Sequence, residues 1–221
     1  MATPHRLLLT GFEPFGTRDT NPSQEVVSLL EKESFAGIEL STRILPVAYL
    51  PAMEWMRTQM MHFDEVIMLG VAWARQEICV ERVAINLMDA TRDDNNGFCP
   101  TDMPIYANAP TAYFSNAPIK QIVAAIRDSG YPCKISNSVG TFVCNAVYYA
   151  ALHEIAIRQT CPDESGLPTQ AVFIHLPSND YLPIPSMAEA IKAAINVQIC
   201  RTVDAGGTSR QVGYVSPADI L

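Results

Sequence analysis

The sequence predicts an α/β fold, a three-layer α/β/α sandwich around a mostly parallel, twisted sheet. Short apolar runs that end in glycine, at 5–11 and 64–70, have the length and composition of buried parallel strands. Segments with helical spacing of apolar residues alternate with such runs, as a sheet covered by helices on both faces requires. Of the 221 residues, 48% are hydrophobic and 17% are charged, which excludes a disordered chain or a coiled coil.

The elements follow one another in a regular order. The first strand, 5–11, is followed by a helix whose start is marked by Asn21-Pro22-Ser23, a capping side chain with a proline in the first turn. We expect further strands at 38–47, 64–70, 77–88, 132–136 and 170–176. We expect further helices at 51–61, 119–129, 143–158 and 187–200. The polar stretch 89–110, which contains glycine and proline, predicts a long functional loop.

One domain is predicted over 1–204, because no linker, repeat or low-complexity tract interrupts the chain. Residues 205–221 are expected to form a C-terminal tail that is loosely held or packed on a neighbouring subunit. The low share of charged residues indicates that surface is buried between subunits, so we expect a homo-oligomer.

Charge and the N-terminal sequence limit the partners. Lys and Arg number 15 against 23 Asp and Glu, a net charge of −8, and no basic cluster exceeds two residues, which argues against nucleic acid and anionic membrane. The apolar run Leu7-Leu8-Leu9 is too short for a signal peptide or a membrane span. We therefore expect a cytoplasmic protein with reduced thiols.

The cysteines predict chemistry at one position and packing at the others. Their spacing contains no zinc motif, so we expect no metal site. We also expect no cofactor. Cys144 falls in the first turn of the predicted helix 143–158, where the helix dipole and free N–H groups lower a thiol pKa and stabilise an oxyanion. The alternative for any cysteine is a small core hydrophobe. We assign that role to the other five, Cys79, Cys99, Cys133, Cys161 and Cys200.

Two further side chains have settings that fit catalysis. His175 ends an apolar strand, where it is either a hydrogen-bonded core residue or a general base for Cys144. Glu81 interrupts a β-rich run, so it either points to solvent or points inward and orients a histidine. Phe12 and Phe15, in a loop constrained by Gly and Pro, either stack on a flat substrate or anchor the loop.

Four segments of the chain resemble, in order, the signature segments of the pyroglutamyl peptidase I family, also called pyrrolidone-carboxylate peptidase. They are 11–16 with 21–23, then 81–86, 140–145 and 173–177. The resemblance implies an α/β/α cytosolic cysteine omega-peptidase, commonly a dimer or tetramer, that removes N-terminal pyroglutamate from peptides. It implies no cofactor or metal.

The resemblance also implies residue roles. Cys144 matches the nucleophile, His175 the base and Glu81 the acid that orients the base. The implied substrate pocket, suited to a neutral lactam ring, is formed by Phe12, Phe15, Phe142, Val143, Val71 and Arg92. The thiolate attacks the exocyclic carbonyl, and His175 protonates the leaving amine and then activates water.

This chain departs from the family pattern at three places. The family's Gly-Gln-Ala-Gly-Gly-Arg is here Gly70-Val71-Ala72-Trp73-Ala74-Arg75, and the second glycine of Phe-Gly-Gly is Thr17. Thr91 stands where the family has an active-site arginine, and Arg92 where it has an apolar pocket residue. Either the loop slips by one residue, or a buried cation favours a carboxylate-bearing acyl group. The alternative functions are a divergent cysteine amidase or lactam-processing enzyme, and a catalytically silent binding relative.

Overall fold

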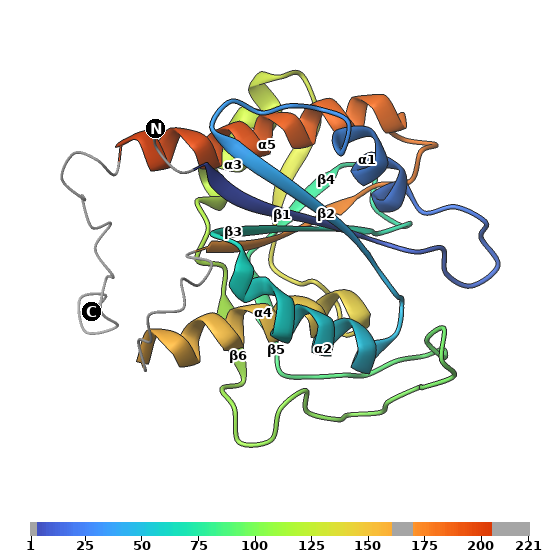
Figure 1. Cartoon of the computed structure of the whole chain (residues 1–221). Helices are drawn as coiled ribbons and strands as arrows, with labels where there is room; N and C mark the ends of the chain where they lie inside the picture. The colour runs from blue at the N-terminus through green and yellow to red at the C-terminus, as the bar shows by residue number, and fades with distance from the viewer. Residues whose placement is uncertain (1–3, 161–169, 205–221) are drawn as a thin grey trace, which may run out of the picture.

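The computed structural model describes residues 4–160 and 170–204 (Figure 1). The predicted tail, 205–221, lies outside them. The strands are β1 (His5–Phe12), β2 (Ile38–Leu45), β3 (Glu65–Val71), β4 (Ile78–Glu81), β5 (Val83–Ile85), β6 (Ala112–Phe114), β7 (Cys133–Ser136) and β8 (Gln170–Leu176). The helices are α1 (Pro22–Leu30), α2 (Tyr49–Gln59), α3 (Ile119–Asp128), α4 (Val143–Thr160) and α5 (Ile184–Asp204), with a 3₁₀ turn at Met60–His62.

Within these residues the main sheet has six strands, in the order β2-β1-β3-β8-β4-β7. Every neighbouring pair is parallel except β4 with β8, which is antiparallel. Helices α1, α3 and α5 cover one face, and α2 and α4 cover the other (Figure 1). The predicted three-layer sandwich with a mostly parallel sheet is therefore confirmed.

Alternation along the strands fills both faces. On β1, Leu7 and Leu9 pack with α1, α3 and α5, while Leu8 packs with α2 and α4. Successive side chains of a strand point to opposite faces, and both faces are covered, so the central strands carry apolar side chains on both faces. No helix in the described part of the chain is long and apolar enough to cross a membrane.

The predicted start of α1 is confirmed in detail. Asn21 Oδ1 accepts hydrogen bonds from Ser23 N at 3.0 Å and from Ser23 Oγ at 2.9 Å, and Pro22 occupies the first turn. Ser23 Oγ in turn accepts from Phe12 N at 2.9 Å, and Asn21 Nδ2 donates to Glu13 O at 2.9 Å. A Cβ on Gly11 would lie 2.7 Å from Ser23 O, so only glycine fits there. The cap thus fixes the end of β1 as well as the start of the helix.

The structure corrects several boundaries. The β-rich run 77–88 forms two strands, β4 and β5, and β5 pairs antiparallel with β6, which was not predicted. Helix α2 begins at Tyr49, whose N–H donates to Asp94 Oδ2 at 2.9 Å. The sequence predicts Phe12 in a loop, and this is wrong: Phe12 is the last residue of β1 and is buried.

Candidate active site

The register of the sheet brings Glu81 and His175 together. Because β4 and β8 are antiparallel and Cys79 pairs with His175, Glu81 lies two residues further on the same face, as a diagonal neighbour. His175 Nδ1 and Glu81 Oε1 are 2.7 Å apart, and both side chains are buried. The prediction that Glu81 points inward and pairs with a histidine agrees with this geometry, and the solvent-facing alternative is wrong.

Cys144 reaches the same row of the sheet from α4. His175 pairs with Gly70 of β3, and a Cβ on Gly70 would lie 3.0 Å from Cys144 Sγ. The thiol therefore occupies space that a side chain at position 70 would fill. Cys144 is the second residue of α4, as predicted, and it lines one cavity together with His175.

The cavity has a volume of about 510 Å³. The rings of Phe15 and Phe142 form part of its wall, with centroids 5.0 Å apart. The buried Tyr49 does not line the cavity but packs edge-on against Phe142 at 5.4 Å. All of the predicted pocket residues line it: Phe12, Phe15, Val71, Arg92, Phe142 and Val143. A cavity of this size and lining suits a small ligand with an apolar ring.

Arg92 differs from the expectation of a buried cation. Its side chain is exposed, and its guanidinium lies 5.8 Å from the centroid of the Phe15 ring. Thr91 lines the cavity beside it. Trp73, which stands in place of a family glycine, also lines the cavity, and the Arg18 guanidinium lies 3.6 Å from the centroid of its ring. Of the residues that depart from the family pattern, Val71, Trp73, Thr91 and Arg92 line the cavity, whereas Thr17 and Ala74 do not.

The Cys144 thiol is protonated at rest, contrary to the expectation from its helix position. Its pKa is raised to about 12, first by burial and then by the negative charge of Glu81. Its own backbone N–H and Arg75 act in the opposite direction but are outweighed. Desolvation of the thiol thus outweighs the hydrogen bond from its own backbone N–H in the first turn of α4.

The His175–Glu81 pair has a defined charge state. Burial lowers the pKa of His175 more than Glu81 raises it, so the imidazole is neutral at neutral pH. Burial raises the pKa of Glu81, but the hydrogen bond and charge of His175, with Ser136 and Arg75, lower it overall. Because the Glu81 carboxylate only accepts, His175 Nδ1 carries the proton and Nε2 is free to accept one.

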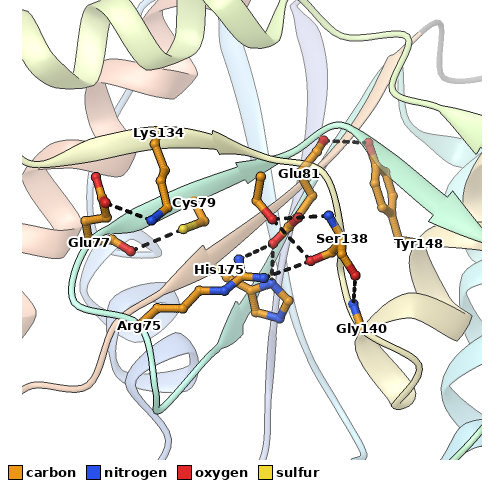
Figure 2. Close-up of polar contacts among 10 residues, drawn as sticks. Arg75, Glu77, Cys79, Glu81, Lys134, Ser138, Gly140, Tyr148 and His175 are labelled. Carbon is orange, nitrogen blue, oxygen red and sulfur yellow. Dashed lines mark hydrogen bonds and ion pairs between the residues drawn. The ribbon is translucent and has the colours of Figure 1, made fainter.

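Two residues without a predicted role hold this site. Arg75 Nη1 forms an ion pair with Glu81 Oε1, and its Nη2 donates to Ser138 O at 2.8 Å (Figure 2). Asn145, next to Cys144, accepts from Ile85 N at 3.0 Å and donates to the carbonyls of Ile85 and Leu87 at 2.9 Å each. The sequence signal for both is the family resemblance: Arg75 stands at the arginine that ends the family's Gly-Gln-Ala-Gly-Gly-Arg, and Asn145 ends the matched segment 140–145, but neither match assigned a role.

The other described cysteines differ in burial. Cys79 and Cys133 are buried, as predicted for core residues, but Cys99 is exposed, which corrects its assignment. Cys161 and the side chain of Cys200 lie outside the description. Among residues 4–160 and 170–204, no three His, Cys, Asp or Glu side chains gather where they could hold a metal ion.

Comparison with known proteins identifies the family. Residues 5–205 match the family model described as pyroglutamyl peptidase. The chain belongs to the pyroglutamyl peptidase family. A pyrrolidone-carboxylate peptidase of Thermococcus kodakarensis is 42% identical over 201 residues, covering 88% of this chain and 94% of the relative. One of Chromobacterium violaceum is 41% identical over 207 residues, covering 91% of this chain and 98% of the relative.

Solved structures agree with this assignment to the pyroglutamyl peptidase family. The pyrrolidone carboxyl peptidase of Thermococcus litoralis superposes with a TM-score of 0.83 at 31% identity, covering 91% of this chain and 96% of that one. A pyrrolidone carboxyl peptidase structure from Pyrococcus furiosus gives 0.82 at 33% identity, covering 89% of this chain and 99% of that one. The family resemblance of the sequence is therefore confirmed over nearly the whole fold.

Proposed function

We propose that this chain is a cysteine omega-peptidase that hydrolyses the amide bond after an N-terminal pyroglutamyl residue. Cys144 is the nucleophile, His175 the general base and acid, and Glu81 the residue that orients His175. The observation that carries the proposal is the buried 2.7 Å contact of Glu81 with His175, on the face of the sheet where Cys144 lies over Gly70. Membership of the pyroglutamyl peptidase family supports the same substrate.

The cavity wall fits the chemistry of the acyl group. Pyroglutamate has no free amine, so its recognition does not depend on a carboxylate that pairs with a cation. The rings of Phe15 and Phe142 and the buried Phe12 supply apolar faces for a five-membered lactam.

Acylation begins from neutral partners. His175 Nε2 takes the proton of Cys144 as the sulfur attacks the exocyclic carbonyl carbon, and the tetrahedral oxyanion forms. We assign the stabilisation of that charge to the N–H groups at the very start of α4. The next two, of Asn145 and Ala146, already donate to Phe142 O at 3.0 and 3.3 Å. The C–N bond then breaks, the proton passes from His175 to the leaving amine, and a thioester to Cys144 remains.

Deacylation reverses the roles. Water loses a proton to His175 and attacks the thioester carbonyl, and the C–S bond breaks. The proton returns from His175 to the sulfur, which releases pyroglutamic acid and restores the thiol. Glu81 stabilises the imidazolium each time it forms.

Hydrolysis of a pyroglutamyl-aminocoumarin by the wild type and by Cys144→Ser tests the proposal. We expect activity in the wild type, its loss in Cys144→Ser, and its retention in the matched control Cys99→Ser, since Cys99 is an exposed thiol. No hydrolysis by any of the three proteins would refute the proposed substrate.

A second candidate, a cysteine amidase with an altered acyl pocket, is favoured by the position of Arg92 at Phe15. A cation near the acyl pocket attracts a carboxylate on the acyl group. If this candidate holds, a carboxylate-bearing acyl arylamide is cleaved faster than the pyroglutamyl one, and Arg92→Ile reverses the preference.

The proposal also includes features of the protein as a whole. We propose a cytoplasmic enzyme that consists of a single peptidase domain over 1–204 and acts on blocked peptides as a homo-oligomer. Sedimentation of the purified protein tests the last point, since a monomer at all concentrations would exclude it.

A further inference from the structure

One guanidinium connects the two halves of the candidate catalytic apparatus. Arg75 Nη1 pairs with Glu81 Oε1, the same oxygen that lies 2.7 Å from His175 Nδ1. Arg75 Nη2 donates to Ser138 O at 2.8 Å, in the loop that leads into α4 (Figure 2). The side chain is thus bound at one end to the acid–base pair and at the other to the segment that carries the nucleophile.

The Ser138 loop is itself a constrained turn. Ser136 Oγ donates to Ser138 O at 3.1 Å. Gly140 N donates to Ser138 Oγ at 3.2 Å (Figure 2). Gly140 has φ of 87°, a left-handed conformation that favours glycine, and α4 begins three residues later. Displacement of Ser138 is therefore transmitted over a short, stiff path to Cys144.

The loop that carries Arg75 is likewise held. Arg75 N donates to Ala72 O at 2.9 Å, and Ala72 N donates to Leu176 O at 2.9 Å, one residue beyond His175. The guanidinium is partly buried, whereas the Glu81 side chain is fully buried and is not reached by solvent. A buried carboxylate needs compensation, and Arg75 supplies it.

We propose that Arg75 is a positioning residue that fixes the His175–Glu81 pair relative to the Cys144 loop. This inference rests on the proposed function, in which those three residues act together. The role requires arginine, because its planar fork presents two N–H groups to two acceptors at once, whereas the ammonium of lysine is a single point.

Arg75 also acts on the charges of the site. The groups that face His175 are Glu81 and Cys79 of β4, Arg75, Cys144 of α4 and the Phe173 ring, whose centroid is 4.8 Å from the imidazole. The positive charge of Arg75 lowers the pKa of His175 and that of Cys144. A substitution that removes this charge and keeps the fold should therefore raise the pKa of His175 and that of Cys144.

The test compares Arg75→Gln, Arg75→Lys and the wild type in the full chain, with pyroglutamyl-aminocoumarin as substrate. We expect Arg75→Gln to lower kcat roughly 10- to 100-fold with little change in KM, as small misplacements of catalytic groups do. We expect the acid limb of its kcat/KM profile to move to higher pH, since His175 is protonated more easily. Arg75→Lys should keep the acid limb at its wild-type pH but have only part of the wild-type kcat.

A matched control is Arg57→Gln, which breaks an exposed ion pair with Glu54. It should leave kcat and the acid limb unchanged. If Arg75→Gln does not fold, Arg75→Lys decides the matter, because it keeps the charge but cannot bind both acceptors at once. Full wild-type kcat in Arg75→Lys would then overturn the proposal. Folded Arg75→Gln with unchanged kcat and acid limb overturns it too.

Alkylation of Cys144 by iodoacetamide separates this inference from the proposed function. It needs no peptide cleavage, so it reports on Arg75 even if the pyroglutamyl substrate is not hydrolysed by the wild type. We expect slower alkylation of Cys144 in Arg75→Gln at every pH from 6 to 9. Equal rates in the two proteins contradict the proposed positioning role.

Discussion

The Cα atom of Gly70 faces the sulfur of Cys144 so closely that a methyl group there would lie 3.0 Å from Sγ and 2.8 Å from Phe173 Cζ. Gly70 is also the register partner of His175, so the same missing side chain makes room for the thiol beside the imidazole. Glycine here is a steric requirement of the site and does not reflect an unusual backbone conformation.

Gly70→Ala should therefore displace the thiol or the Phe173 ring. We expect a loss of about 1–3 kcal/mol in unfolding free energy, typical of an overpacked core, and a fall in kcat of at least about 10-fold. Urea unfolding and steady-state kinetics measure both. The control is Gly37→Ala, where φ is 76° and the space is open: it should lose stability through backbone strain and keep its kcat. Wild-type kcat in Gly70→Ala would contradict this account.

The protonated thiol predicts a pH dependence of alkylation. Since burial raises the pKa of Cys144 to about 12, the thiolate fraction grows with pH throughout the neutral range. In a Cys99→Ser background, which removes the exposed thiol among the described cysteines, the rate of Cys144 alkylation should increase steadily from pH 6 to 9. A rate that is already constant at pH 6–7 would indicate a thiolate–imidazolium pair instead.

Glu81→Gln tests the orientation of His175. Glutamine is nearly isosteric but cannot stabilise the imidazolium, so we expect kcat to fall by roughly two to four orders of magnitude, with KM little changed. Binding of the unreactive product, pyroglutamate, should be kept, as calorimetry measures. A kcat within tenfold of wild type would exclude Glu81 from this role.

The same carboxylate predicts an acid response of stability. The folded-state pKa of Glu81 is lowered, so its contribution to stability is complete above the unfolded value, about 4.3, and is lost as pH falls through the lower folded value. Unfolding free energy should therefore decrease more steeply below pH 4 in the wild type than in Glu81→Gln. Parallel curves for the two proteins would show that folding does not lower the pKa of Glu81.

Asn145→Ala should loosen the start of α4. Its three hydrogen bonds to Ile85 and Leu87 join the helix to β5, and their loss leaves buried backbone groups without partners. We expect about 2–4 kcal/mol lower unfolding free energy. Asn96→Ala, on the exposed surface, is the control and should change stability by less than about 0.5 kcal/mol. Equal stability of both variants would refute the anchoring role.

Local patterns were sufficient for much of the fold. The strand 170–176 was predicted with the bounds of β8, and the Asn21 cap with the start of α1, because apolar runs and capping chemistry are properties of adjacent residues. The reversal of β4 was not predictable in this way, since its direction depends on its partner β8. Strand β6 is only three residues long and carries too few positions to show alternation.

In the candidate site, too, the features set by adjacent residues were predictable and those set by distant residues were not. Cys144, His175 and Glu81 were identified from their settings and from the family resemblance, whereas the pKa of the thiol was predicted in the wrong direction. The helix N-terminus is visible in the sequence, but the burial that overrides it comes from strands distant along the chain. Arg75 was not assigned a role for the same reason, because its acceptor Ser138 lies 63 positions away.

The Asn21–Ser23 cap has a consequence for how substrate preference can change. Ser23 Oγ binds Phe12 N, and Phe12 lines the acyl cavity, so one set of atoms starts a helix and sets the position of a pocket wall. Substitutions in this cap would alter folding and selectivity together, which restricts the routes by which new specificity arises. Variation is freer where loops supply the cavity wall, as at Trp73 and Arg92, and both of these positions depart from the family pattern.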